Sequence, residues 1–129
     1  EAALMDLHDL EHNARDGLHI ASLAGSWIAL VAGFGGMRDH GGQLSFCPQL
    51  PPGIGRLSFA LRWRGATVHL TITAAETTYT LRDGAAVELR HDGQTFTLGT
   101  ESVRQPTCHV SPLTPAPAQP AGRAPIRHS

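Results

Sequence analysis

The chain has 129 residues, a formal net charge of −1 and a sequence pI near 6.8. It therefore carries no basic surface of the kind that binds nucleic acid. The sequence starts at Glu1 with no initiator methionine, no basic leader and no cleavage-site pattern, so we expect an internal start within a longer protein.

Two apolar helices are predicted first, a short one over residues 2–10 and a longer one over residues 20–34, which glycines end. One side of the longer helix carries large apolar residues at helical spacing, Ile20, Leu23, Trp27, Ile28, Val31 and Phe34. The opposite side carries small residues, Ser22, Gly25, Ala29 and Ala32. Both sides should therefore be buried against other helices, which this chain does not supply. About fifteen residues is too short to cross a bilayer, so we expect no membrane span and infer the C-terminal piece of a larger protein.

Beyond the helix, the apolar period changes to that of β-strands. Apolar and polar residues alternate over residues 57–63, 67–72, 79–81, 87–89 and 96–98. Leu44 and Phe46 predict an edge strand that stops at Pro48. The pairs Asp83-Gly84 and Asp92-Gly93 are predicted to form hairpin turns. Short strands at this spacing indicate a small antiparallel β-sandwich.

The two cysteines give a weak signal. Cys47 lies in a predicted strand and Cys108 in a Pro-rich segment, too far apart in sequence for a disulfide framework or a zinc cluster. We expect free thiols in a reducing cytoplasm. From Pro106 onward the sequence is rich in Pro and Ala and has few large apolar residues, which predicts a disordered tail or linker.

His8, Glu11 and His12 match H-x-x-E-H, a pattern in which two histidines hold zinc and the glutamate acts as a base. Five-residue patterns arise easily by chance in a chain with eight histidines, and no third ligand is evident. We therefore favour a solvated helix face and expect no metal site.

Other polar and aromatic residues have structural interpretations. Arg38, Asp39 and His40 follow the long helix, where an Arg–carboxylate pair is expected to fix the junction with the sandwich. Trp63 and Tyr79 fall on the inward phase of their strands, so core packing is preferred over stacking on a sugar.

Three blocks of sequence stand in a specific order. They read MDLHDLEHNARDGLHIASLAGSW from Met5, GFGGMRDHGGQLSFCPQLP from Gly33 and LSFALRWRGATVHLTI from Leu57. Together they resemble the C-terminal part of family 65 of the glycoside hydrolases, which includes the maltose, trehalose and kojibiose phosphorylases. The resemblance implies an α+β fragment. Its expected parts are the last helices of an (α/α)6 barrel in residues 1–37, a jelly-roll-like antiparallel β-sandwich in residues 38–101, and a disordered Pro/Ala-rich tail or linker in residues 102–129.

The family resemblance also implies a reaction. An upstream Glu acts as general acid, and inorganic phosphate attacks an α-linked glucosyl disaccharide with inversion, giving β-glucose 1-phosphate and a free sugar. Phosphate is then a substrate, no cofactor is implied, and this fragment alone should be inactive. The family also implies a homodimer.

His19 matches the histidine of the family's G-[IL]-H motif, which implies that it binds phosphate. The N-terminus of the following helix would add amide donors and a favourable dipole. Ser22 and Gly25, one turn further, are candidates for the same pocket, although small residues for close helix packing explain them equally well.

Two other functions stay open. The sandwich could be a non-catalytic carbohydrate-binding or assembly module, or the chain could belong to a family 65 hydrolase. His19 argues against hydrolysis, because an inverting hydrolase keeps a carboxylate at this position to activate water. The disaccharide cannot be inferred, because the loops that select it lie upstream in the family.

Overall fold

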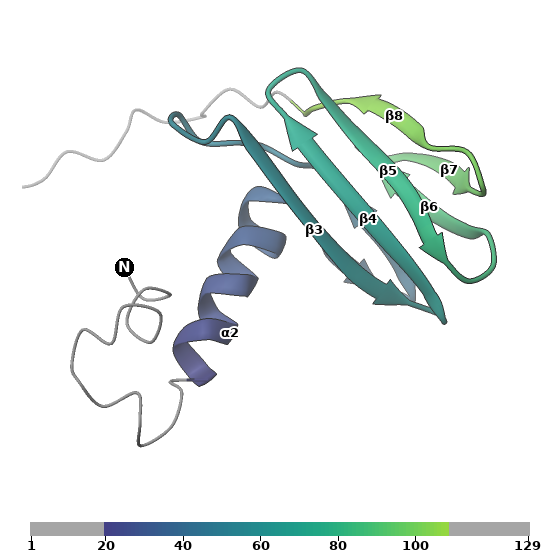
Figure 1. Cartoon of the computed structure of the whole chain (residues 1–129), viewed down its shortest axis with the longest axis horizontal. Helices are drawn as coiled ribbons and strands as arrows, with labels where there is room; N and C mark the ends of the chain where they lie inside the picture. The colour runs from purple at the N-terminus through teal and green to yellow at the C-terminus, as the bar shows by residue number, and fades with distance from the viewer. Residues whose placement is uncertain (1–19, 109–129) are drawn as a thin grey trace, which may run out of the picture.

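A computed structural model describes residues 20–108, which form a helical segment followed by two four-stranded sheets (Figure 1). The helical segment consists of α2 (Ile20–Ile28) and the π-helix η2 (Ala29–Phe34). The strands are β1 (Arg38–His40), β2 (Gln43–Phe46), β3 (Arg56–Trp63), β4 (Ala66–Thr73), β5 (Glu76–Asp83), β6 (Val87–His91), β7 (Gln94–Leu98) and β8 (Val103–Pro106). The predicted small β-sandwich is confirmed, but it is not antiparallel throughout, because β2 pairs with β6 in parallel. The first predicted helix, the H-x-x-E-H motif, His19 and residues 109–129 of the expected tail lie outside the described residues.

The first sheet has the order β3-β4-β5-β8 and is antiparallel throughout. β3 and β4 form a hairpin around Arg64 and Gly65, whose φ angles of 48° and 82° are those of a two-residue type I′ turn. β8 pairs with β5, from Tyr79↔Val103 to Glu76↔Pro106. The expected end of the sandwich at residue 101 is therefore wrong. Main-chain pairing at the sheet edge holds β8, and its sequence has too few apolar residues to show a strand pattern.

The second sheet has the order β1-β2-β6-β7. The predicted hairpin turn at Asp92-Gly93 is confirmed between β6 and β7, with φ angles of 45° and 77°. β2 is not an edge strand, because it lies between β1 and β6, and it runs parallel to β6. Asp83-Gly84 is not a hairpin turn either, because the chain crosses there from β5 in one sheet to β6 in the other. Gly84 has a φ of 95°, and a Cβ at this position would lie 2.6 Å from the Cα of Ala66. The crossing therefore requires glycine.

The core lies between the two sheets. Its buried members are Leu44, Phe46, Ala66, Val68, Leu70, Tyr79, Val87, Leu89 and Leu98. The Tyr79 ring is fully buried, with its centroid 5.6 Å from that of Phe46 and 5.0 Å from that of Phe96. Trp63 is half-buried against the same core. Core packing is thus confirmed for Tyr79 and is the main role of Trp63. The apolar side chains that alternate with polar ones in the sequence face this core.

The last turns of the helical segment meet the sandwich, and its first turns lead away from it (Figure 1). Val31 is buried, and a Cβ at Gly35 would lie 3.1 Å from the Phe59 ring. Earlier in the segment, Ile20 is 74% exposed and Trp27 is 46% exposed. The expected burial of both helix sides is therefore not met within residues 20–108. In the same part of the chain, no helix has the length and apolar character needed to cross a membrane.

Candidate functional site

The predicted phosphate site is centred on the start of α2. His19 lies outside the described residues, directly before α2 in the sequence. Ser22 and Gly25, three residues apart, share one face of α2. The first turn of α2 carries no acidic side chain, so nothing in it opposes an anion at the helix N-terminus.

Ser22 and Gly25 differ in their surroundings. Ser22 is half-buried, and its carbonyl oxygen accepts a hydrogen bond of 2.9 Å from the Ser26 hydroxyl. A Cβ at Gly25 would meet no heavy atom within 4 Å. No packing partner within residues 20–108 therefore accounts for the glycine.

An apolar helix face borders this predicted site. Four large side chains of the helical segment are exposed, Ile20 at 74%, Trp27 at 46%, Ile28 at 56% and Leu30 at 38%. They are the exposed large apolar residues of the described part of the chain, and all four lie on one fifteen-residue segment. An apolar surface of this kind marks an interaction site.

The junction between helix and sandwich is held by main-chain contacts. The amide of Gln49 donates to the carbonyl of Phe34 at 2.8 Å, and the amide of Cys47 donates to that of Gly36 at 3.3 Å. Gly36 has a φ of 61°, and a Cβ there would overlap the main chain of Cys47. These contacts fix the direction in which α2 leaves the sandwich.

Arg38 secures the same junction, but with other partners than predicted. Its guanidinium donates to the carbonyls of Ala32 at 2.6 Å and Met37 at 2.7 Å. Among the ion pairs found in residues 20–108, none involves Arg38 or Asp39. The expected Arg–carboxylate pair is therefore wrong for this part of the chain. Carbonyls near the end of a helix lack intrahelical partners, and the Ala32 carbonyl in η2 serves as an acceptor for Arg38.

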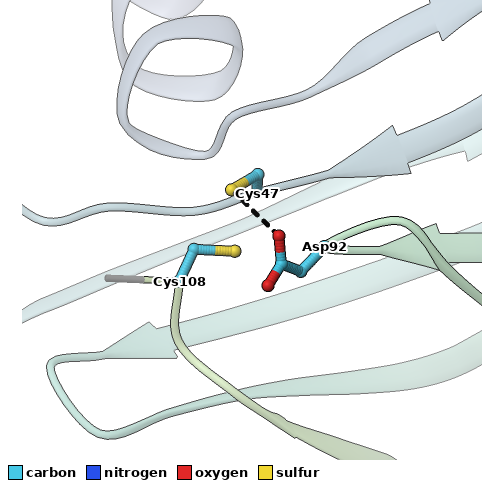
Figure 2. Close-up of side chains that lie close together, drawn as sticks. All are labelled: Cys47, Asp92 and Cys108. Atoms are coloured by element: carbon cyan, nitrogen blue, oxygen red, sulfur yellow. Dashed lines mark hydrogen bonds between the residues drawn. The ribbon is translucent and has the colours of Figure 1, made fainter. Parts of the chain in front are cut away.

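The fold also brings together two residues that the sequence separates. Cys47, at the end of β2, and Cys108, beyond β8, lie beside Asp92 (Figure 2). Their ligand-type atoms all lie within 4.8 Å of one another. Distance along the chain is therefore no argument against a cluster here, and that part of the sequence interpretation is wrong. Both thiols are free, as expected.

A buried histidine lies next to this cluster. The Tyr79 hydroxyl lies 2.6 Å from Nδ1 of His91, and Nε2 of His91 lies 2.7 Å from the carbonyl oxygen of Pro106. A carbonyl only accepts, so Nε2 of His91 donates to Pro106, while Nδ1 shares a hydrogen bond with the Tyr79 hydroxyl. Burial is the main reason why the pKa of Tyr79 is raised above its usual value. His91 continues the inward phase of Val87 and Leu89, the one sequence signal for its burial.

The fold and the uncovered helix define a small β-sandwich domain with an attached helix that needs further partners. Residues 37–98 match the C-terminal domain of glycosyl hydrolase family 65. The chain belongs to this family, as the C-terminal part of a family 65 protein.

Named relatives agree with this assignment. An uncharacterized glycosyl hydrolase of Mycobacterium leprae is 55% identical over 98% of this chain. The α,α-trehalose phosphorylase of Thermoanaerobacter brockii is 41% identical over 67% of the chain, and the kojibiose phosphorylase of Escherichia coli is 35% identical over 80%. This chain spans 16%, 11% and 13% of their respective lengths.

A solved structure shares the fold. A putative kojibiose phosphorylase from the human microbiome superposes with a TM-score of 0.69 over 81% of this chain and 14% of its own, at 20% sequence identity. At this identity the likeness supports the sandwich architecture alone.

Proposed function

We propose that this chain is the C-terminal part of an inverting α-glucosyl disaccharide phosphorylase. The protein would convert a disaccharide and inorganic phosphate into β-glucose 1-phosphate and a free sugar. The observation that carries the proposal is the identity of 41% and 35% to proteins named as disaccharide phosphorylases. The general acid would lie upstream, so the 129-residue chain alone should not catalyse the reaction, and the protein would be a homodimer in the cytoplasm, as in the family.

The exposed side chains of the helical segment α2–η2 support a location inside a larger helical domain. These four large side chains need a cover, and this chain spans about a sixth or less of the relatives' lengths. We assign the cover to the upstream part of the same protein, with α2 as the last helix of an (α/α)6 barrel. The open space beside Gly25 would then receive a neighbouring helix or the bound phosphate.

His19 would be the residue of this chain that binds phosphate directly. An imidazole before a helix N-terminus donates a hydrogen bond to an anion, and the exposed amides of the first turn add their dipole. Ser22, one turn further on α2, would line the same pocket. A carboxylate in place of His19 would repel phosphate and favour water as the nucleophile.

The sandwich itself gives little support to a carbohydrate-binding module. All seven aromatic residues lie within residues 20–108. Tyr79 is buried, Trp63 is half-buried, and the exposed Trp27 lies on the helix, not on a sheet. Stacking on a sugar needs an exposed ring on the binding face, and neither sheet presents one.

The proposal is tested by product analysis with the full-length protein. Maltose, trehalose and kojibiose are each supplied with and without inorganic phosphate, and glucose 1-phosphate and free glucose are measured separately. We expect β-glucose 1-phosphate from one of them, formed only with phosphate. Release of both sugars at a rate independent of phosphate would establish the hydrolase instead.

A further inference from the structure

A cluster of three potential metal ligands lies where both sheets meet the helix junction. Cys47 follows β2, Asp92 lies in the turn between β6 and β7, and Cys108 follows β8 (Figure 2). The Sγ atom of Cys47 lies 4.0 Å from Oδ1 of Asp92, and all three ligand atoms lie within 4.8 Å of one another. The side chains point toward a common centre from three separate segments (Figure 2).

Main-chain hydrogen bonds fix the segments that carry these ligands. The amide of Asp92 donates to the carbonyl of Phe46 at 3.0 Å, which places the Asp92 side chain beside Cys47. Next to Cys108, the amide of Thr107 donates to the carbonyl of Ala75 at 3.0 Å. The Thr107 hydroxyl also donates to the carbonyl of Thr73 at 2.8 Å. The segments that carry the ligands are therefore fixed before any ion binds, which lowers the entropic cost of binding.

Charged and titratable groups surround the cluster. Burial in the first place, and then the neighbouring Cys47 and Asp92, raise the pKa of Cys108 to about 12, so a metal ion has to displace the thiol proton. Arg38 and Arg90 line an adjoining cavity, but their guanidinium groups donate to main-chain carbonyls and to Gln43. Among residues 20–108, the ion pair that forms is Arg104 with Glu76, on another part of the surface. The guanidinium groups of Arg38 and Arg90 are thus held by acceptors outside the cluster.

We propose that Cys47, Asp92 and Cys108 bind a zinc ion. Two thiolates and a carboxylate suit zinc, whose tetrahedral sites use sulfur at about 2.3 Å and place two sulfur ligands about 3.8 Å apart. The observed separations reach this arrangement when the side chains close by about 1 Å. On binding, each thiol loses its proton to solvent and both sulfurs bond to the metal as thiolates.

The surroundings supply the remaining features of the site. A cavity of about 280 Å³ borders Cys47 and Asp92, so water has access to the fourth coordination position. His91 is not a fourth ligand, because its Nε2–H donates to Pro106. The same nitrogen lies 3.9 Å from Sγ of Cys108, where an N–H group stabilises a thiolate.

The ion would connect the two sheets. Cys47 and Asp92 extend from strands of the β1-β2-β6-β7 sheet, whereas Cys108 follows β8 at the edge of the other sheet. A metal bond across this seam would hold the end of β8 against β6 and against the helix junction at Gly36. Zinc would therefore link the two sheets of the sandwich, independent of the proposed reaction.

The test uses the full-length protein, purified under reducing conditions, stripped with a chelator and reloaded with zinc. Zinc per chain is measured by mass spectrometry for the wild type, C47S, D92N and C47S/C108S, with D83N as a control carboxylate at the other Asp-Gly turn. We expect one zinc ion more per chain in the wild type and D83N than in C47S/C108S. In C47S and D92N, zinc affinity should fall by more than about tenfold, because even outer-shell changes weaken metal sites by 10- to 100-fold.

Two further measurements distinguish loss of the metal ligands from misfolding of the variants. Cobalt substitution should give a thiolate-to-metal charge-transfer band in the wild type. The band should be weaker in C47S, which keeps one of the two thiols, and absent in C47S/C108S. Circular dichroism checks that the variants keep their folds. Equal zinc content in the wild type and in folded C47S, D92N and C47S/C108S would overturn the proposal. So would a Cys47–Cys108 disulfide, found by thiol alkylation of the protein as isolated from cells.

Discussion

Replacement of Trp27 by Ala tests whether an upstream domain covers α2. Trp27 is 46% exposed in this chain. A tryptophan side chain buries up to about 250 Å², so about 100 Å² remains for a partner to cover. At about 25 cal/mol per Å², this cover contributes about 2.5 kcal/mol. W27A should therefore weaken α2 by this extra amount in the full-length protein and not in the isolated chain.

Hydrogen–deuterium exchange of peptides from residues 20–34 measures this local free energy directly. In the full-length protein, W27A should speed amide exchange in α2 about 60-fold, which is 2.5 kcal/mol at tenfold per 1.4 kcal/mol. In the isolated chain the change should be much smaller. V31A is the matched control, because Val31 is already buried within the described chain and should matter in both contexts. If wild-type α2 exchanges as fast in the full-length protein as in the isolated chain, the reasoning is refuted.

Three further predictions concern the sandwich and the phosphate site. A chain without residues 1–34 should be more soluble than the whole chain and keep its β circular dichroism, and loss of that signal would show that the helix is integral to the sandwich. In this shortened chain, the contribution of Tyr79 to stability should be fully present below about pH 10 and fall at higher pH, because burial raises the pKa of Tyr79 and the unfolded state loses the proton first. Phenolate absorbance of this single tyrosine should rise together with unfolding, and Y79F should remove its share of the pH dependence. In the full-length protein, His19→Glu should reduce phosphorolysis and introduce slow hydrolysis, seen as free glucose without glucose 1-phosphate; unchanged product ratios would contradict this.

The sequence is sufficient to predict the strands in which apolar and polar side chains alternate, because burial of one face of a strand imposes a period of two residues. It also indicates the β6–β7 turn, where Asp92 and Gly93 both adopt positive φ. The parallel pairing of β2 with β6 depends on segments far apart in the chain, which no local pattern encodes. The sequence does not predict β8 either, because pairing with β5 holds this strand and its own residues show no alternating apolar pattern.

The two candidate sites also differ in whether the sequence predicts them. The exposed face of α2 is visible in the sequence as a helix with too many apolar residues for this chain to cover. The Cys47–Asp92–Cys108 cluster is not visible, because closure of the two sheets alone brings β2 and the end of β8 together. Arg38 was expected to pair with a carboxylate, but within residues 20–108 the carbonyls of Ala32 in η2 and of Met37 are its partners.

The measurement that tests the central proposal most directly is a phosphate titration of the full-length protein with His19 intact and replaced. His19→Ala should raise KM for phosphate far more than KM for the disaccharide, because one hydrogen bond to an anion, worth about 1.5 to 3 kcal/mol, is lost. This corresponds to a change of about 10- to 150-fold. His40→Ala, at an exposed histidine in β1, is the control and should leave both constants unchanged. If His19→Ala alters neither the phosphate dependence nor the rate, His19 does not bind phosphate and the assigned site is contradicted.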